Sequence, residues 1–337
     1  MKVVYCQQPN TFHEREEEKP VPKEGEALLH IKRIGICGTD IHAFYGNQPY
    51  FTYPRVLGHE LSGEIVEMNG ESEFQLGDGV TIVPYMECGN CVACRNGKPN
   101  CCVSLRVLGV HTDGGMKEFL SVPFSHLVKV NDISLDAAAL IEPLSIGAHA
   151  VRRAEVKEHE QVLVIGAGPI GLAVMKFAVL AGAKVIAMDI NRERLRFCQQ
   201  WTGVDHVIQG GEDALSELQR LTNGDGAWTV IDATGNQHSM NEAIRYVSHG
   251  GKLVFVGLTK ENVSFQHPEM HKREMTVSGS RNATRADFEY VISCIEKGLV
   301  DCEALLTKRI KLDEVARQFA AVTDPKTNVI KVMVEVE

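Results

Sequence analysis

The chain has 337 residues, of which 44% are hydrophobic and 23% charged, and its formal net charge is −9. This composition is typical of a globular protein of about two domains, which can bury a full core without disulfide staples. An acidic chain without a long Lys/Arg block argues against binding to nucleic acid or to an anionic membrane.

The N-terminus carries no apolar signal core, because it turns polar and charged over residues 13–19. Export is therefore not expected, and we expect a cytoplasmic protein. The ten cysteines are then expected to be thiols and metal ligands rather than disulfides. A long apolar stretch over 162–188 is interrupted by Lys176, Lys184 and several glycines, which favours two strands flanking a helix over a membrane span.

The first 125 residues are predicted to form a strand-rich domain with short connections. Apolar alternation is typical of strands over 26–36 and 61–67, and Pro and Gly recur at turn-like intervals. Residues 136–154 carry apolar side chains at helical spacing, which predicts a connecting helix.

Strands and helices alternate from residue 161 onward. Strands are predicted over 161–165, 184–188, 228–232 and 252–256. Helices are predicted over 169–180, 192–201, 285–297 and 313–322. A last strand is predicted over 329–336. The alternation indicates an α/β fold with a doubly wound parallel sheet.

A G-x-G-x-x-G pattern stands between a predicted strand and a predicted helix, as Gly166-Ala167-Gly168-Pro169-Ile170-Gly171. Such glycines let the backbone approach a pyrophosphate at the positive end of the helix, so the motif predicts a dinucleotide site. Asp189, at the end of the next strand, would accept hydrogen bonds from the adenosine ribose and repel a 2′-phosphate, which favours NAD over NADP. Arg194 would flank the adenine or pair with Asp189. A ligand-free strand–helix turn is the alternative.

Four cysteines have the spacing C-x2-C-x2-C-x7-C, at Cys88, Cys91, Cys94 and Cys102. Four sulfur ligands close a tetrahedral shell around one zinc ion, which predicts a structural site without chemistry of its own. The neighbouring Cys101 leaves an ambiguity of one residue, and we expect Cys102 to be the ligand.

A second set of metal-type residues, Cys37, His59 and Glu60, offers mixed S, N and O ligands, as an open catalytic zinc site does. Glu142 stands at the start of the predicted connecting helix. Each residue alone has a simpler explanation, such as a core thiol or a helix N-terminal charge for Glu142. Together with the dinucleotide motif they favour a metalloenzyme with one structural and one catalytic zinc.

Five motifs occur in the order seen in zinc-dependent medium-chain dehydrogenases, which the chain resembles over essentially its whole length. They are Gly35–Asp40, Gly58–Glu60, the four-cysteine lobe, Glu142–Leu144 and Gly166–Gly171. The resemblance implies a β-rich GroES-like catalytic domain over residues 1–150, completed by 281–337. It also implies a Rossmann NAD-binding domain inserted over 151–280.

By this resemblance, Cys37, His59 and Glu60 bind the catalytic zinc, and Glu142 binds it directly or through water. Glu60 together with Glu142 is similar to the polyol and sugar branch, whereas liver-type alcohol dehydrogenases have a cysteine where Glu142 falls. Thr39 would accept the substrate hydroxyl proton and His42 would pass it through the cofactor ribose to solvent, with turn capping as the alternative. The segments resembling those that border the nicotinamide comprise Val256, Gly257, Leu258, Ser280, Arg281 and Asn282.

Residues 46–57 and 279–284 are most similar to oxidoreductases that act on hexonates at C5, such as L-gulonate or L-galactonate. An acid substrate needs a cation, and Arg281 or Arg55 would supply it unless each is a structural ion-pair partner. Sorbitol-type polyols and L-threonine are alternative substrates, and an inactive zinc- and NAD-binding regulatory protein is a more distant alternative. Relatives form dimers or tetramers, so we expect a homo-dimer or homo-tetramer, with residues 263–265 as a candidate joining edge.

Overall fold

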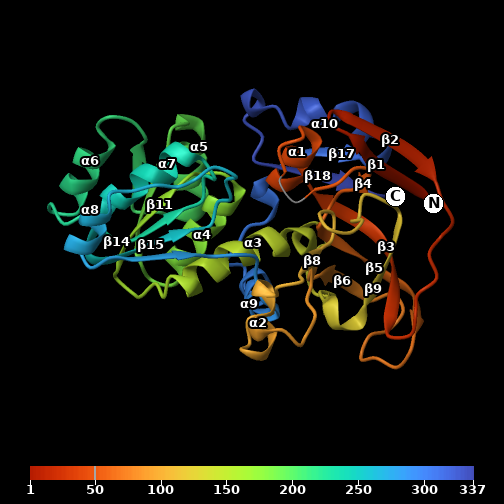
Figure 1. Cartoon of the computed structure of the whole chain (residues 1–337). Helices are drawn as coiled ribbons and strands as arrows, with labels where there is room; N and C mark the ends of the chain where they lie inside the picture. Colours follow the sequence, from red (N-terminus) through yellow and green to blue (C-terminus); the bar gives the residue numbers. More distant parts are fainter. Residues whose placement is uncertain (49–50) are drawn as a thin grey trace. The chain divides into compact units, whose positions relative to one another are not determined.

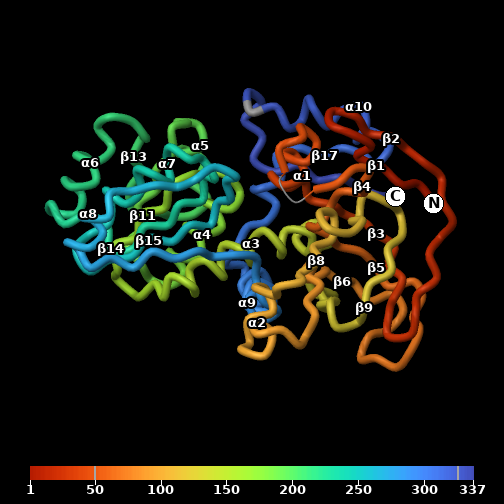
Figure 2. The backbone as a smooth tube through the Cα atoms, in the orientation of Figure 1, coloured from red at the N-terminus to blue at the C-terminus, as the bar shows by residue number. Residues whose placement is uncertain are grey.

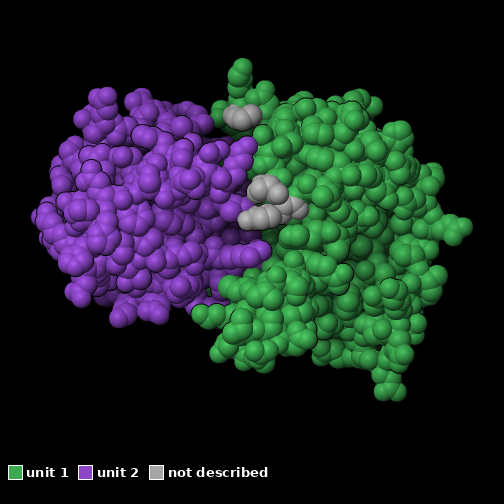
Figure 3. Space-filling view, viewed as in Figure 1, with its two compact units in different colours: residues 1–143, 284–337 green, residues 144–283 purple. Residues whose placement is uncertain are grey.

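The computed structural model describes residues 1–48 and 51–337 of the chain. The chain divides into two compact units, coloured separately in Figure 3. Unit 1 comprises Met1–Pro143 and Thr284–Glu337, and unit 2 comprises Leu144–Ala283. Both chain ends therefore belong to unit 1, as the tube in Figure 2 shows. Of the stretch 46–57 that resembles hexonate oxidoreductases, residues 49 and 50 lie outside the described residues.

Unit 1 is built on a seven-stranded sheet of order β10-β6-β5-β3-β18-β17, with β9 also paired to β3 (Figure 1). Its strands are β3 (Glu26–Gly35), β5 (Glu60–Asn69), β6 (Gly79–Ile82), β9 (Phe119–Pro123), β10 (Leu127–Lys129), β17 (Leu306–Lys311) and β18 (Lys331–Glu335). The strands predicted over 26–36 and 61–67 are thus β3 and β5. These two run antiparallel at the centre of the sheet.

Smaller elements surround this sheet. Three short strands form a second sheet, β1 (Lys2–Gln8), β2 (Thr11–Glu16) and β4 (Arg55–Val56). Two more form a ribbon, β7 (Tyr85–Met86) and β8 (Arg106–Val107). The α-helices that lie wholly within the described part of unit 1 are α1 (Gly38–Phe44), α2 (Val92–Arg95), α9 (Arg285–Glu296) and α10 (Val315–Val322). The helix predicted from residue 313 begins later because Leu312–Glu314 form a 3-10 turn.

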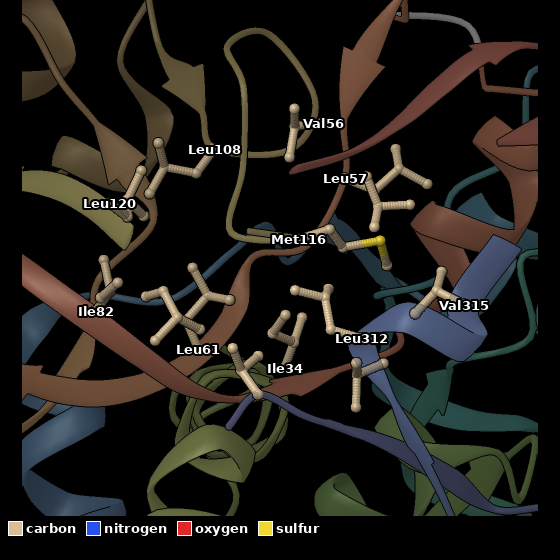
Figure 4. Close-up of a cluster of buried hydrophobic side chains, with 14 of the residues drawn as sticks. Ile34, Val56, Leu57, Leu61, Ile82, Leu108, Met116, Leu120, Leu312 and Val315 are labelled. Carbon is tan, nitrogen blue, oxygen red and sulfur yellow. The ribbon is translucent and has the colours of Figure 1, made fainter. Parts of the chain in front are cut away.

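The core of unit 1 lies against β3 and β5. Ile34 and Leu61 are register partners on these strands, and both are fully buried. They pack in one cluster with Met116 and Leu312 (Figure 4). Burying each such side chain contributes about 1.5–3 kcal/mol. This core fixes the ends of β3 and β5, next to which Cys37 and Glu60 lie.

Unit 2 contains a six-stranded parallel sheet of order β13-β12-β11-β14-β15-β16. Its strands are β11 (Gln161–Ile165), β12 (Lys184–Asp189), β13 (His206–Gln209), β14 (Ala227–Asp232), β15 (Val247–Phe255) and β16 (Thr276–Gly279). Its helices are α4 (Pro169–Leu180), α5 (Arg192–Thr202), α6 (Ala214–Leu221), α7 (Gln237–Glu242) and α8 (His267–Lys272). This strand order is that of a doubly wound nucleotide-binding sheet, so the predicted fold class is confirmed.

Three predictions need correction. Glu142 does not lie at the start of its helix: α3 (Leu135–Arg153) begins seven residues earlier, where the Ser134 hydroxyl accepts the N–H of Ala137 at 3.2 Å. Strand β15 begins at Val247, ahead of the predicted residue 252, and ends at Phe255. Residues 263–265, predicted as a joining edge of the sheet, form no strand. The two edge strands of the described sheet are β13 and β16.

None of the helices in the described part of the chain combines the length and the apolar character that crossing a membrane requires.

Candidate functional site

Asp40 ties together the two segments that carry candidate metal ligands in unit 1. Cys37 follows β3 and precedes α1, and its backbone N–H donates to Oδ2 of Asp40 at 2.9 Å. The other oxygen of Asp40 accepts the N–H of Gly58, next to His59, at 3.2 Å. Asp40 is fully buried. Sequence analysis gave it no role, although it belongs to the Gly35–Asp40 motif.

Strand pairing brings Glu60 to the same place. Glu60 begins β5 opposite Gly35 of β3, and a side chain at position 35 would collide with the Glu60 carboxylate. Cys37, His59 and Glu60 present ligand atoms that all lie within 4.8 Å of one another. A thiolate, an imidazole and a carboxylate at this spacing fit a zinc ion and leave a fourth position for substrate.

Lys331 of β18 is a buried cation that sequence analysis missed. Its Nζ lies 2.5 Å from each carboxylate oxygen of Glu60 and donates to the carbonyl of Ile36 at 3.2 Å. Burial opposes the ammonium form, but the charges of Glu60 and Cys37 raise the pKa of Lys331. The available signal was a lysine directly before three apolar residues of a predicted strand.

The surroundings of His59 favour positive charge. Burial alone would lower the pKa of His59, yet the charges of Cys37 and Asp40 raise it well above its ordinary value. Its Nδ1 lies 3.8 Å from Asp40 and has no hydrogen-bond partner among the described residues. An anion-rich, buried pocket of this kind stabilises a cation, whether a proton or a metal ion.

Glu142 lies inside α3, one residue before Pro143, and stands apart from the group of three. Its Oε1 accepts a hydrogen bond from the hydroxyl of Tyr85, and its Oε2 is buried with no hydrogen-bond partner in the described chain. Burial is the main reason why the pKa of Glu142 rises to about 7 and that of Tyr85 rises well above its usual value. Tyr85, three residues before Cys88, was not anticipated from the sequence.

Thr39 and His42 both lie on α1, after Cys37. Thr39 is partly exposed in the first turn, and His42 is exposed in the last. Their roles in a proton relay stay predictions.

The four-cysteine lobe lies between β7 and β8. The sulfur atoms of Cys88, Cys91, Cys94 and Cys102 all lie within 4.8 Å of one another. Cys102 is 3% exposed and accepts the N–H of Cys88 at 3.3 Å, whereas Cys101 is exposed. The backbone N–H of Asn90 and the hydroxyl of Ser104 lower the pKa of Cys88 to about 6, but burial and the neighbouring sulfurs raise that of Cys94 to about 12. Without a metal ion, the neighbouring sulfurs therefore cannot all be thiolates at once. A bound dication stabilises all four thiolates together, so the lobe fits a closed metal site.

In unit 2 the glycine motif forms the tight turn between β11 and α4. Gly166 has φ +99°, and a Cβ on Gly171, in the first turn of α4, would collide with the carbonyl oxygen of Gly166. Gly168 is the N-cap of α4, Pro169 is its first residue and Ile170 its second. The turn thus places the N-terminus of α4, the end of a helix that favours a phosphate, directly after the glycines.

Asp189 ends β12 beside this turn. Its Oδ2 accepts the N–H of Ala167 at 2.6 Å, and its Oδ1 accepts the N–H of Asn191 at 2.8 Å. Carboxylate oxygens have further lone pairs, so the side chain can also accept from ribose hydroxyls. Arg194 on α5 makes no ion pair with Asp189 within the described chain, and its Nε is buried without a hydrogen bond there.

The two segments expected near the nicotinamide follow the carboxyl ends of β15 and β16. The N–H groups of Val256 and Gly257 donate to the carbonyl of Asp232 at 2.9 and 3.2 Å, and Leu258 is 61% exposed. Ser280 donates its N–H to Phe255, and its hydroxyl is buried without a partner in the described residues. Arg281 is exposed, and Asn282 has φ +53°. Ligands of parallel α/β sheets bind at this edge.

Comparisons with known proteins agree with both units. Residues 23–132 match the alcohol dehydrogenase GroES-like domain, and residues 169–297 match the zinc-binding dehydrogenase family. L-galactonate-5-dehydrogenase of Escherichia coli (strain K12) is 45% identical over 320 residues, which cover 95% of this chain and 94% of that protein. Sorbitol dehydrogenase of Bacillus subtilis (strain 168) is 31% identical over 337 residues, covering 96% and 95%.

A solved structure has the same architecture. The alcohol dehydrogenase RspB from E. coli CFT073, complexed with the cofactor NADH, has a TM-score of 0.93 and 32% identity, with 99% of each chain covered. Sequence motifs, fold and relatives thus agree over the whole length. The chain therefore belongs to the zinc-dependent medium-chain dehydrogenases, in the branch that holds the polyol and sugar-acid dehydrogenases.

Proposed function

We propose that the chain is a zinc-dependent oxidoreductase that moves a hydride between the C5 alcohol of a hexonate, such as L-galactonate or L-gulonate, and NAD. The observation that carries this proposal is the group of Cys37, His59 and Glu60, the last two of them buried, whose ligand atoms all lie within 4.8 Å of one another. The 45% identity to L-galactonate-5-dehydrogenase supports the substrate class. Bound zinc supplies Lewis acidity toward the substrate hydroxyl, and NAD exchanges hydride at C4 of its nicotinamide.

The residues of the chain divide the remaining work. Cys37, His59 and Glu60 hold the zinc, and Lys331 fixes the Glu60 carboxylate. Thr39, two residues after Cys37, takes the proton that the substrate hydroxyl loses, and the exposed His42 delivers it to solvent. A proton leaving by this route frees the alcohol to give up hydride.

Asp189 is proposed to select NAD over NADP, with Arg194 beside the adenine. The NADH-bound relative supports this cofactor, and a carboxylate at the ribose repels a 2′-phosphate. Steady-state rates with both cofactors test this assignment. The protein should have a higher kcat/KM with NAD than with NADP, and Asp189→Ala should lower the ratio of these two values by about tenfold or more. Asp205→Ala is the matched control, because Asp205 also accepts a backbone N–H at the sheet, from Val185. Equal rates with NADP in the unmodified protein would overturn the assignment.

Substrate class is tested by turnover of hexonates, polyols and L-threonine with NAD. We expect a hexonate to have the highest kcat/KM. No turnover of any hexonate, together with good sorbitol or threonine activity, would refute the proposal. The 31% identity to a sorbitol dehydrogenase over 96% of the chain makes a polyol the second candidate.

Recognition of the substrate carboxylate is proposed for Arg281 or Arg55. Arg55 lies 3.4 Å from Asp113 and donates to the Thr52 hydroxyl at 2.9 Å. Arg281 is exposed, and it too has a partner within the chain. Replacing the arginine that binds the carboxylate by lysine should raise KM for hexonates but not for sorbitol, because only the acid needs the planar fork. Arg281→Lys and Arg55→Lys are therefore compared, and the variant of the other arginine should leave both KM values unchanged.

We further propose two zinc ions per chain and a homo-dimer or homo-tetramer. Metal analysis should give two zinc ions per chain, and light scattering should give the mass of two or four chains. One zinc per chain together with no activity would instead support the regulatory alternative.

A further inference from the structure

Tyr85 and Glu142 form a buried pair at the edge of the candidate metal group. Tyr85 is 4% exposed and Glu142 is 1% exposed. The phenol donates its hydrogen bond to Oε1 of Glu142, while Oε2 has no hydrogen-bond partner among the described residues. One oxygen of this carboxylate is thus restrained and the other is available.

Glu142 is close to the candidate metal group without being part of it. The negative charge of Glu142 contributes to raising the pKa of His59 and of Lys331. Within the described chain, however, only Cys37, His59 and Glu60 have ligand atoms that all lie within 4.8 Å of one another. Three protein ligands leave a fourth position open, as catalytic zinc sites require. The Glu142 carboxylate, entering that position as a fourth protein ligand, would close the site.

We propose that Tyr85 is a positioning residue that holds Glu142 back from the metal, so that the fourth position stays open to substrate. The inference rests on the proposed function, since it presupposes zinc at Cys37, His59 and Glu60. Tyr85 acts through Glu142 and has no part in the chemistry itself.

The fold holds the phenol firmly enough for this role. Tyr85 lies on β7 and pairs with Val107 of β8, and the four-cysteine lobe is the connection between these two strands. Its ring and that of Phe288 of α9 lie nearly perpendicular to each other, with ring centroids 6.4 Å apart. A metal that closes the lobe therefore also fixes the ribbon from which Tyr85 reaches Glu142.

The second carboxylate of the site is held in a different way. Oε1 of Glu60 accepts a hydrogen bond from the ammonium of Lys331, which lies 2.5 Å from both oxygens of this carboxylate, and Oε2 of Glu60, like Oε2 of Glu142, has no hydrogen bond in the described residues. Glu142 is paired through one oxygen with a neutral phenol. A cation keeps Glu60 in place inside the group, whereas the phenol keeps Glu142 outside it.

The test is Tyr85→Phe, which removes only the hydroxyl. Losing a residue that supports a metal ligand normally lowers metal affinity 10- to 100-fold. For Tyr85→Phe we expect metal affinity to rise instead. Co²⁺ bound at the Cys37 group should bind about tenfold more tightly, because the released Glu142 carboxylate becomes an additional ligand. The visible spectrum of the Co²⁺ protein should change and lose its response to added alcohol, and kcat should fall. Chelator competition and absorption spectroscopy measure these effects.

Two controls separate this role from a merely structural one. Tyr5→Phe removes another phenol that donates to a carboxylate, that of Glu17, and should leave affinity and spectrum unchanged. In a Glu142→Gln background, Tyr85→Phe should no longer raise the affinity, because the double variant has no carboxylate to release.

Unchanged or weaker Co²⁺ binding by a folded Tyr85→Phe protein, with a native circular dichroism spectrum, would overturn the inference while leaving the proposed function intact. A wild-type protein that binds metal only in the lobe would overturn the proposed function, and this inference with it.

Discussion

The four-cysteine lobe and the Cys37 group both gather metal ligands in unit 1, but they do so by different means. The lobe takes its four sulfurs from one short segment, Cys88–Cys102, whose ligands range from exposed to buried. The Cys37 group takes its ligands from the end of β3 and the start of β5, and two of the three are buried. A closed site can be built locally, whereas an open site needs strand pairing to bring its ligands together.

The two sites also balance charge differently. Backbone N–H groups and the Ser104 hydroxyl stabilise negative charge on Cys88 in the lobe. In the Cys37 group the balancing charge is a side chain from elsewhere in the fold, the ammonium of Lys331, which lies against Glu60. We therefore expect the loss of a metal ligand from the lobe to appear mainly as lost stability, and the loss of a metal ligand from the Cys37 group to appear mainly as lost turnover.

The largest effect is expected for Cys37→Ser. A serine hydroxyl is a poor zinc ligand, so kcat should fall by at least about 1,000-fold, or about 4 kcal/mol of activation free energy. The melting temperature should change little, because Cys37 is only partly buried at a strand end. Turnover and thermal unfolding of the same preparation measure both. If Cys37→Ser lowered the melting temperature as much as a lobe variant does, the Cys37 group would also be a structural site, and the proposed difference between the two sites would be wrong.

Lys331→Met should give the next largest effect, on stability rather than turnover alone. It leaves the buried Glu60 carboxylate without its cation, which should lower the free energy of unfolding by about 3 kcal/mol after metal removal. Restoring zinc should recover part of this loss, since the dication replaces the ammonium as a partner charge. Urea unfolding with and without zinc measures the difference.

Lys129→Met is the matched control for this prediction. Its ion pair with Asp78 spans 2.7 Å, but the lysine side chain is 42% exposed. Exposed pairs contribute about 0–1 kcal/mol, so this variant should lose little stability with or without zinc. Equal losses from the two lysine variants would show that the Glu60 pair is not special.

Cys94→Ser, in the lobe, should have a smaller effect than Cys37→Ser or Lys331→Met. It removes one of four sulfurs, and we expect a loss of about 2 kcal/mol of stability together with one zinc per chain. Turnover at low temperature should fall less than tenfold, because the lobe acts on the reaction only by holding the ribbon that carries Tyr85. Complete loss of turnover in a folded protein would assign the lobe a direct role in the chemistry.

The contrast between the sites also explains what could be predicted from the sequence. The lobe was visible from spacing alone, and the unit 2 turn from glycines between a strand and a helix. Lys331 and Tyr85 were missed because their partners, Glu60 and Glu142, lie 271 and 57 residues away along the chain. Such pairs arise from strand and helix packing, and single-sequence periodicity carries no information on them. Glu142 was misplaced in its helix because a capping serine sets where α3 begins.

The smallest effect is expected for Cys101→Ser, and it tests the ambiguity in the lobe. Cys101 is exposed and lies outside the group of four sulfurs, whereas its neighbour Cys102 is buried within it. Losing an exposed thiol should change stability by no more than about 0.5 kcal/mol, with both zinc ions retained. Cys102→Ser should release the lobe zinc. If Cys101→Ser released the lobe zinc and Cys102→Ser retained it, Cys101 would be the fourth ligand. The backbone would then have to shift by one residue when metal binds, so the ion rather than the backbone alone would determine the final shape of the lobe.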